Sequence, residues 1–183
     1  IAALLTSLTI AREWESGTME QLLSTPVRPA ELLLGKLCAY FVLGMADLAL
    51  ALLIGVGVFG GPMRGNPAFV IFSSGLFLFG ALCWGIFIST VTRSQLLAFQ
   101  ASLITSFLPA FLLSGFISSI ENMPVVIQQL TRIIPSRYFV TILQGVFLKG
   151  TGMQALWLEV AFLAVYAAVV LLLASRAMKQ KVA

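Results

Sequence analysis

The sequence contains no histidine and few charged residues. Only 10% of its 183 residues are Asp, Glu, Lys or Arg, whereas a soluble domain has about 25%. The absence of histidine excludes histidine acid–base catalysis and metal sites built on imidazole. The two cysteines, Cys38 and Cys83, lie in apolar stretches, where thiols are usually packing residues and do not indicate the redox compartment.

The sequence also lacks a phosphate-binding loop. Gly35 and Lys36 would fit the end of one, but Ala30 and Leu37 stand where that motif needs glycine and serine or threonine. We therefore expect this chain to bind no cofactor, so that any ATP-driven work depends on another chain. The net charge of +4 comes from basic residues dispersed between apolar stretches, which does not indicate nucleic-acid binding.

Long apolar stretches dominate what is present, and 60% of the residues are hydrophobic. Stretches 37–59, 68–91, 96–117 and 155–174 each reach the roughly 20 residues that a helix needs to span a bilayer. We expect an all-α integral membrane protein, a polytopic helical bundle forming one transmembrane domain over 1–183, because helices satisfy their own backbone polar groups. Residues 1–10 are apolar but too short to span, and we expect the end of a helix there.

The basic residues predict the orientation. Placing segments 11–36, 92–95 and 175–183 in the cytoplasm follows the positive-inside rule and leaves 118–154 outside. That placement collects seven of the eleven basic residues: Arg12, Arg28, Lys36, Arg93, Arg176, Lys179 and Lys181.

The cytoplasmic segment 11–36 has an unusual concentration of acid. Four of the seven acidic residues lie there: Glu13, Glu15, Glu20 and Glu31. Residues 12–26 predict a short surface helix, with Ser16 or Gly17 capping its start, Glu20 near its positive end and Pro26 stopping it. Pro29 suits the first turn of the next helix. A helix lying on lipid headgroups is one interpretation, but its acidic character favours docking to a cytoplasmic protein.

Three stretches resemble the permease subunits of ABC-2 type exporters, in the branch with bacterial drug-efflux-like permeases. They are REWESGTMEQLLSTP at 12–26, leading to Gly35-Lys36, SGFISSIENMP at 114–124, and IIPSRYF at 133–139. With the spacing of the spans, the resemblance covers essentially the whole chain, as the C-terminal half of such a subunit. Family members usually begin with another transmembrane helix and a sizeable external domain, which this sequence does not contain.

The resemblance implies a function and partners. The chain would be a permease subunit in the bacterial cytoplasmic membrane, exporting a substrate such as a drug or lipid. A separate cytoplasmic subunit would bind ATP and Mg²⁺, and a second permease chain would complete a homo- or heterodimer. The 12–26 loop would hold the coupling helix that fits a cleft on the ATP-binding subunit. Its contact set would be Glu13, Glu15, Gly17, Thr18, Glu20 and Leu22.

The external segment 118–154 predicts short amphipathic helices. Pro124 can open the first, and Pro135 separates it from a second that begins near Ser136. The resemblance implies that they dip into the outer leaflet and close the exit, which makes Pro124, Pro135, Arg137 and Tyr138 an external gate. Two surface helices in a solvated loop are the alternative.

Small residues recur at every fourth position of the 96–117 span, which lets helices pack closely or lines a pathway. They are Ala98, Ser102, Ser106, Ala110 and Ser114, with Pro109 able to kink the helix.

Asp47 lies near the middle of a span that contains no Lys or Arg, where a charged Asp costs roughly 3 kcal/mol. It is either a neutral acid bonded to Ser, Thr or Tyr, or a polar contact for a cation. An ion-coupled secondary transporter using Asp47 is therefore the alternative function.

Overall fold

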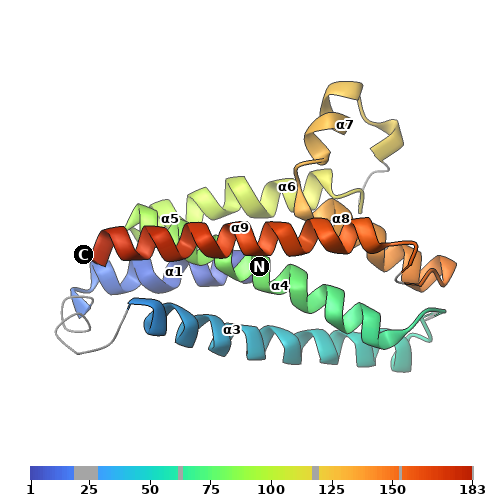
Figure 1. Cartoon of the computed structure of the whole chain (residues 1–183), viewed down its shortest axis with the longest axis horizontal. Helices are drawn as coiled ribbons and strands as arrows, with labels where there is room; N and C mark the ends of the chain where they lie inside the picture. The colour runs from blue at the N-terminus through green and yellow to red at the C-terminus, as the bar shows by residue number, and fades with distance from the viewer. Residues whose placement is uncertain (19–28, 62–63, 117–119, 153, 183) are drawn as a thin grey trace. The chain divides into compact units, whose positions relative to one another are not determined.

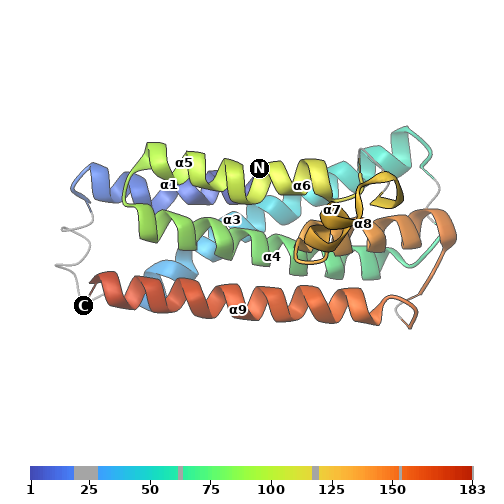
Figure 2. The ribbon, with the colours of Figure 1, turned by 90° about the horizontal axis from the view of Figure 1, so that it is seen from above.

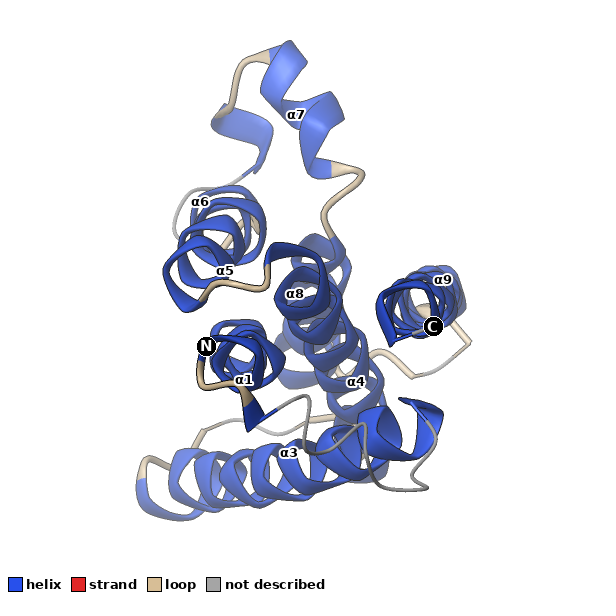
Figure 3. Ribbon diagram, turned by 90° about the vertical axis from the view of Figure 1, so that its left-hand side faces the viewer, coloured by secondary structure: helices blue, strands red, loops and turns tan. Residues whose placement is uncertain are grey.

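Every regular element in the described part of the chain is a helix. The computed structural model describes residues 1–18, 29–61, 64–116, 120–152 and 154–182, and no strand occurs among them (Figures 1 and 3). The α-helices are α1 (Ala2–Glu15), α3 (Pro29–Leu52), α4 (Pro67–Thr92), α5 (Gln95–Ser102), α6 (Leu108–Leu113), α7 (Val125–Thr131), α8 (Pro135–Gln144) and α9 (Trp157–Val182). The remaining helical elements are the π-helical turns η1 (Leu53–Val58), η2 (Leu103–Phe107) and η4 (Gly145–Lys149) and the 3₁₀ turn η3 (Ile120–Asn122).

Four continuous helices are long and apolar enough to cross a membrane. They are Glu31–Val58, Pro67–Thr92, Gln95–Leu113 and Trp157–Met178. The all-α membrane fold predicted from the sequence is therefore confirmed. The third helix ends at Leu113 instead of 117, and Gly115 beyond it has a positive φ of 82°, which a helix does not allow.

Helix α1 runs further than the sequence predicted. The expected helix end at residue 10 is wrong, because α1 continues through Arg12 and ends at Glu15. Ser16 is its C-cap and Gly17 follows with a φ of 71°, the left-handed conformation that commonly closes a helix. Ser16 and Gly17 therefore end α1, although residues 12–15 had been included in the predicted surface helix, and Thr18, directly after them, is again helical. Residues 19–26 of that predicted surface helix lie outside the described part of the chain.

The chain divides into two compact units. Unit 1 comprises Ile1–Val42, Phe79–Leu108 and Ala167–Ala183. Within it α1 packs closely on α4, because Gly85 has no side chain to collide with Thr6 and the Ala3 carbonyl. The Ser89 hydroxyl of α4 also accepts the backbone N–H groups of Ile10 and Ala11, at 3.0 and 2.8 Å.

Helix α5 lies beside α1 in unit 1 (Figures 1 and 2). Ala98 and Ser102, from the row of small residues, are fully buried there. The row does not continue as one packing face, since η2 interrupts the helix and Ser114 belongs to unit 2. Pro109 accounts for the interruption: it has no N–H to donate, and the N–H of Leu108 bonds instead to Leu103, five residues back.

Unit 2 comprises Leu43–Leu78 and Pro109–Tyr166. Its core joins the start of α4 to α8, η4 and the start of α9. The buried members are Phe69, Val70, Ile142, Val146, Leu156, Val160 and Leu163. Gly65 is in close contact with Val146, and Arg64 donates to the carbonyl of Leu148 at 3.5 Å. The structure thus brings the segment before α4 against the 118–154 segment, which was predicted to lie outside.

Candidate functional site

The end of α1 is tied to α3 by an ion pair. Glu13 Oε1 lies 2.5 Å from Lys36 Nζ, and the two side chains are only 24% and 20% exposed. Solvent screens a partly buried pair less than a fully exposed one. Because Lys36 lies in the second turn of α3, the pair connects the two helices that flank the predicted coupling loop.

Glu15 binds the first residue of α5. Its Oε1 accepts the backbone N–H of Gln95 at 2.8 Å, and its Oε2 accepts Gln95 Nε2 at 2.6 Å. The first N–H groups of a helix have no partner within the helix and carry partial positive charge. Ser94, the N-cap of α5, makes no capping bond with its own side chain. A carboxylate from α1 therefore caps α5.

The hydrogen bonds at Glu15 change its acidity. The backbone N–H of Gln95, followed by the Gln95 side chain and by Ser94, holds the pKa of Glu15 below its ordinary value. Each donor stabilises the ionised carboxylate over the neutral acid. Glu15 is thus an anion at neutral pH, as its capping role requires.

Trp14 holds the turn between α4 and α5. The Arg93 guanidinium lies 4.2 Å from the centroid of the Trp14 ring, a cation–π contact. Arg93 has a φ of 54°, which is uncommon for any residue other than glycine. Three consecutive residues, Glu13, Trp14 and Glu15, therefore contact α3, the α4–α5 turn and α5. We call them the α1 clamp.

The next residues close α1 with their hydroxyl groups. Ser16 Oγ and Thr18 Oγ1 both donate to the Glu13 carbonyl at 3.4 Å and lie 2.9 Å from each other. Gly17 and Thr18, two of the predicted coupling residues, are exposed. The other two, Glu20 and Leu22, lie outside the described residues.

Sequence reasoning identified Glu13 and Glu15 but not what they bind. It treated Arg93 and Gln95 only as parts of a short cytoplasmic link. A tryptophan and an arginine in otherwise polar segments are typical of a cation–π pair, but no local pattern pairs residues this far apart.

The predicted gate prolines stand at helix starts. Pro124 is the N-cap of α7 and Pro135 is the first residue of α8, where the missing N–H of proline costs no hydrogen bond. These positions agree with the two short helices expected in 118–154.

Arg137 and Tyr138, the other predicted gate residues, fasten α8 to the end of α7 in unit 2. Arg137 Nη1 donates to Thr131 Oγ1 at 2.6 Å. Tyr138 Oη donates to the Arg132 carbonyl at 2.8 Å, and its ring stacks on Phe162 of α9 with centroids 3.9 Å apart. A cation at the last turn of α7 complements the negative end of that helix.

Asp47 lies on an exposed side of α3 in unit 2. Among the described residues it has no hydrogen-bond or ion-pair partner, so the bond to Ser, Thr or Tyr that the sequence allowed is not found. Exposed Leu43, Leu50 and Ile54 recur at helical spacing beside it. Asp47 therefore interrupts an exposed apolar stripe.

Comparison with known proteins identifies the family. The model of the ABC-2 family transporter protein matches residues 1–176. The chain is 50% identical over 163 residues to the probable multidrug ABC transporter permease YbhS of Escherichia coli, covering 89% of this chain and 43% of YbhS. It is 33% identical over 154 residues to the probable multidrug ABC transporter permease YbhR (84% and 42%). It is 32% identical over 159 residues to the inner membrane transport permease YhhJ of E. coli (86% and 42%).

The chain thus belongs to the ABC-2 family of transporter proteins, as its resemblance predicted. It is a multi-pass membrane protein with several apolar helices. It spans less than half the length of the curated relatives it matches. These relatives give no support to the ion-coupled alternative built on Asp47.

Proposed function

We propose that the chain is the membrane-spanning portion of an ABC exporter permease, which moves its substrate out across the bacterial cytoplasmic membrane. Its family and its permease relatives support this function. ATP and Mg²⁺ bind to a separate cytoplasmic subunit, and this chain has no enzymatic activity of its own. A hydrophobic drug is the favoured substrate class over a lipid, since two relatives carry the word multidrug in their names.

The α1 clamp is the observation that carries the coupling mechanism. In this proposal, the ATP-binding subunit docks on the segment that follows α1, and its closure on ATP displaces the end of that helix. Because Glu13 pairs with Lys36 and Glu15 caps α5, the displacement reaches α3 and α5 together. Two helix positions that differ in their contacts with the partner are what energetic coupling requires.

The clamp also divides the roles within the predicted contact set. The carboxylates of Glu13 and Glu15 are occupied by Lys36 and Gln95. They therefore position the end of α1, while exposed Gly17 and Thr18, with Glu20 and Leu22 beyond them, contact the ATP-binding subunit.

The stripe around Asp47 supports a second permease chain as partner. An ionised Asp facing lipid near the middle of a bilayer costs roughly 3 kcal/mol, so the stripe is better covered by protein or by a polar pathway. Either a homo- or a heterodimer supplies such a cover, and lipid surrounds the rest. Ser102, Ser106, Pro109 and Ser114 then serve helix packing, and the α7–α8 hairpin with Pro124, Pro135, Arg137 and Tyr138 serves as the external gate.

Crosslinking tests the docking step. In the full-length permease with Cys38 and Cys83 replaced by serine, Thr18→Cys should crosslink to a cysteine in the ATP-binding subunit, and Val126→Cys on α7 should not. Crosslinking from Val126 and not from Thr18 would contradict the proposed orientation, in which the end of α1 is cytoplasmic and α7 is external.

Transport assays test the coupling step. In proteoliposomes holding both subunits, Glu15→Ala should raise the ATP hydrolysed per dye molecule exported several-fold, because the displacement no longer reaches α5. Gln100→Ala is the control: it changes an exposed residue of α5 that Glu15 does not contact, and it should leave the ratio unchanged. An unchanged ratio in Glu15→Ala would refute the mechanism.

A further inference from the structure

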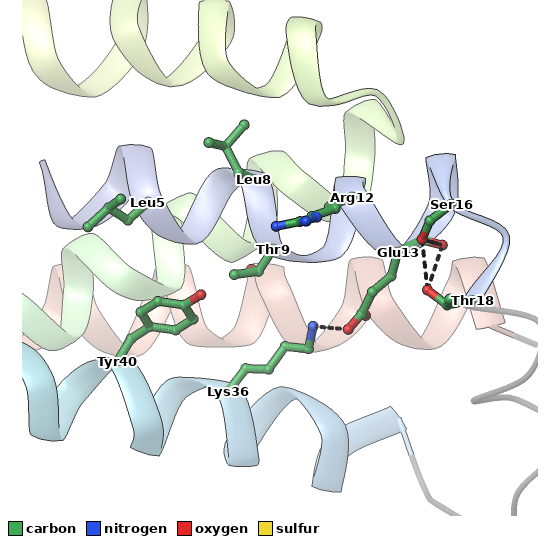
Figure 4. A pocket seen from close by; sticks show the side chains of 9 residues that line it. All are labelled: Leu5, Leu8, Thr9, Arg12, Glu13, Ser16, Thr18, Lys36 and Tyr40. Atoms are coloured by element: carbon green, nitrogen blue, oxygen red, sulfur yellow. Dashed lines mark hydrogen bonds and ion pairs between the residues drawn. The ribbon is translucent and has the colours of Figure 1, made fainter.

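We propose that a pocket between α1 and α3 binds the headgroup of an anionic phospholipid. The pocket lies within unit 1 and has a volume of about 650 Å³. Figure 4 shows Lys36 and Tyr40 extending from α3 towards the residues of α1 that form the opposite wall. Its ligand is distinct from the transported substrate and from the ATP-binding subunit.

The pocket changes from apolar to polar along α1. Leu5 and Leu8 line it about two to three turns before the end of the helix, and Arg12 lines it in the last turn. Lys36 stands opposite, at the same polar end. A phospholipid has the same order of groups, with acyl chains followed by a charged headgroup. Basic pockets at the ends of transmembrane helices are typical binding sites for such headgroups.

The charges of the pocket match a single negative charge. Lys36 is neutralised by Glu13, whereas Arg12 has no ion-pair partner among the described residues. The remaining charge is therefore +1, and an arginine fork suits two phosphate oxygens. The hydroxyl of Tyr40 also lines the pocket and adds a donor for phosphate.

The charge of the pocket distinguishes two phospholipids. Phosphatidylglycerol carries one negative charge on its phosphate, which matches the remaining positive charge of Arg12. Phosphatidylethanolamine has no net charge and leaves the charge of Arg12 uncompensated.

Native mass spectrometry tests this site. The full-length permease, purified with its ATP-binding subunit, is titrated with phosphatidylglycerol and with phosphatidylethanolamine. Wild type should retain phosphatidylglycerol about tenfold more strongly, and Arg12→Gln should lose that preference. Arg176→Gln removes an exposed arginine from α9 in the same unit and should keep it. Equal retention of the two lipids by wild type, or an undiminished preference in Arg12→Gln, would overturn the proposal.

Two further measurements identify the source of the phosphate. Tyr40→Phe, which keeps the ring, should weaken phosphatidylglycerol retention several-fold without changing the thermal unfolding temperature. Soluble glycerol phosphate at the same concentration should not displace the lipid, because it lacks chains to contact Leu5 and Leu8. If it does displace the lipid, the pocket takes a free phosphate and the lipid proposal fails.

Discussion

The carboxylate of Glu15 holds both the backbone and the side-chain amide of Gln95, which is 80 residues further along the chain. This pairing joins the end of one helix to the beginning of another. It makes the end of α1 a structural neighbour of the α4–α5 turn.

Acid should weaken the cap on α5. The pKa of Glu15 lies below its ordinary value of 4.5 because of the Gln95 amides. A carboxyl group with a lowered native pKa stabilises the fold above its ordinary pKa, and loses that contribution as the pH falls through the native value. The unfolding temperature of wild type should exceed that of Glu15→Gln at pH 7, and the difference should shrink as the pH falls below 4.5 and vanish below the native pKa of Glu15. A difference that is constant with pH would contradict the prediction.

Trp14 and Arg93 should be energetically coupled. Trp14→Ala and Arg93→Ala each remove the same cation–π contact, so their effects on the free energy of unfolding should not add. We expect a coupling of about 0.5 to 1 kcal/mol in a double-mutant cycle, the usual value at an exposed site. Pairing Trp14→Ala with Arg176→Ala supplies the control, which should be additive.

Gly85→Ala should destabilise unit 1. A Cβ at this position collides with the Thr6 hydroxyl and the Ala3 carbonyl of α1, so the two helices must move apart. We expect a loss of about 1 to 3 kcal/mol, as for other overpacked sites. Gly35→Ala is the matched control, because nothing lies near its added Cβ and alanine favours a helix. Thermal unfolding in detergent compares the two.

Arg137→Gln should loosen α7. The change removes a charged donor from the Thr131 hydroxyl, and such hydrogen bonds contribute about 1.5 to 3 kcal/mol. Amide hydrogen exchange in α7 should become about tenfold faster or more. Arg132→Gln is the control, because that exposed residue acts through its backbone carbonyl. Equal protection of α7 in both variants would show that packing alone holds the hairpin.

Local chemistry in the sequence predicted much of this fold. Apolar runs of sufficient length identified the membrane helices, and Pro29, Pro124 and Pro135 marked helix starts because proline restricts its own backbone. The end of α1 was missed since the end of the apolar run at residue 10 was also taken as the end of the helix. A helix can continue beyond the lipid, and here Gly17 ends it.

The partners in the candidate site could not be predicted in the same way. The resemblance to ABC-2 permeases implied a functional role for Glu15, but its bond to Gln95 depends on the packing of α1 against α5. The burial of Ser102 also depends on long-range packing. The π-helical turn η2 begins at the next residue, and none of its residues is buried. Long-range packing decides these contacts.

Successive residues of an α-helix are about 100° apart around its axis, so Glu13, Trp14 and Glu15 leave α1 in three directions. Each direction leads to a different neighbour within unit 1. A rotation of α1 about its own axis, or a tilt towards one neighbour, stretches the contacts on the other sides. Displacing the attached helix ends as one block stretches none of the three, and that is the motion this arrangement favours.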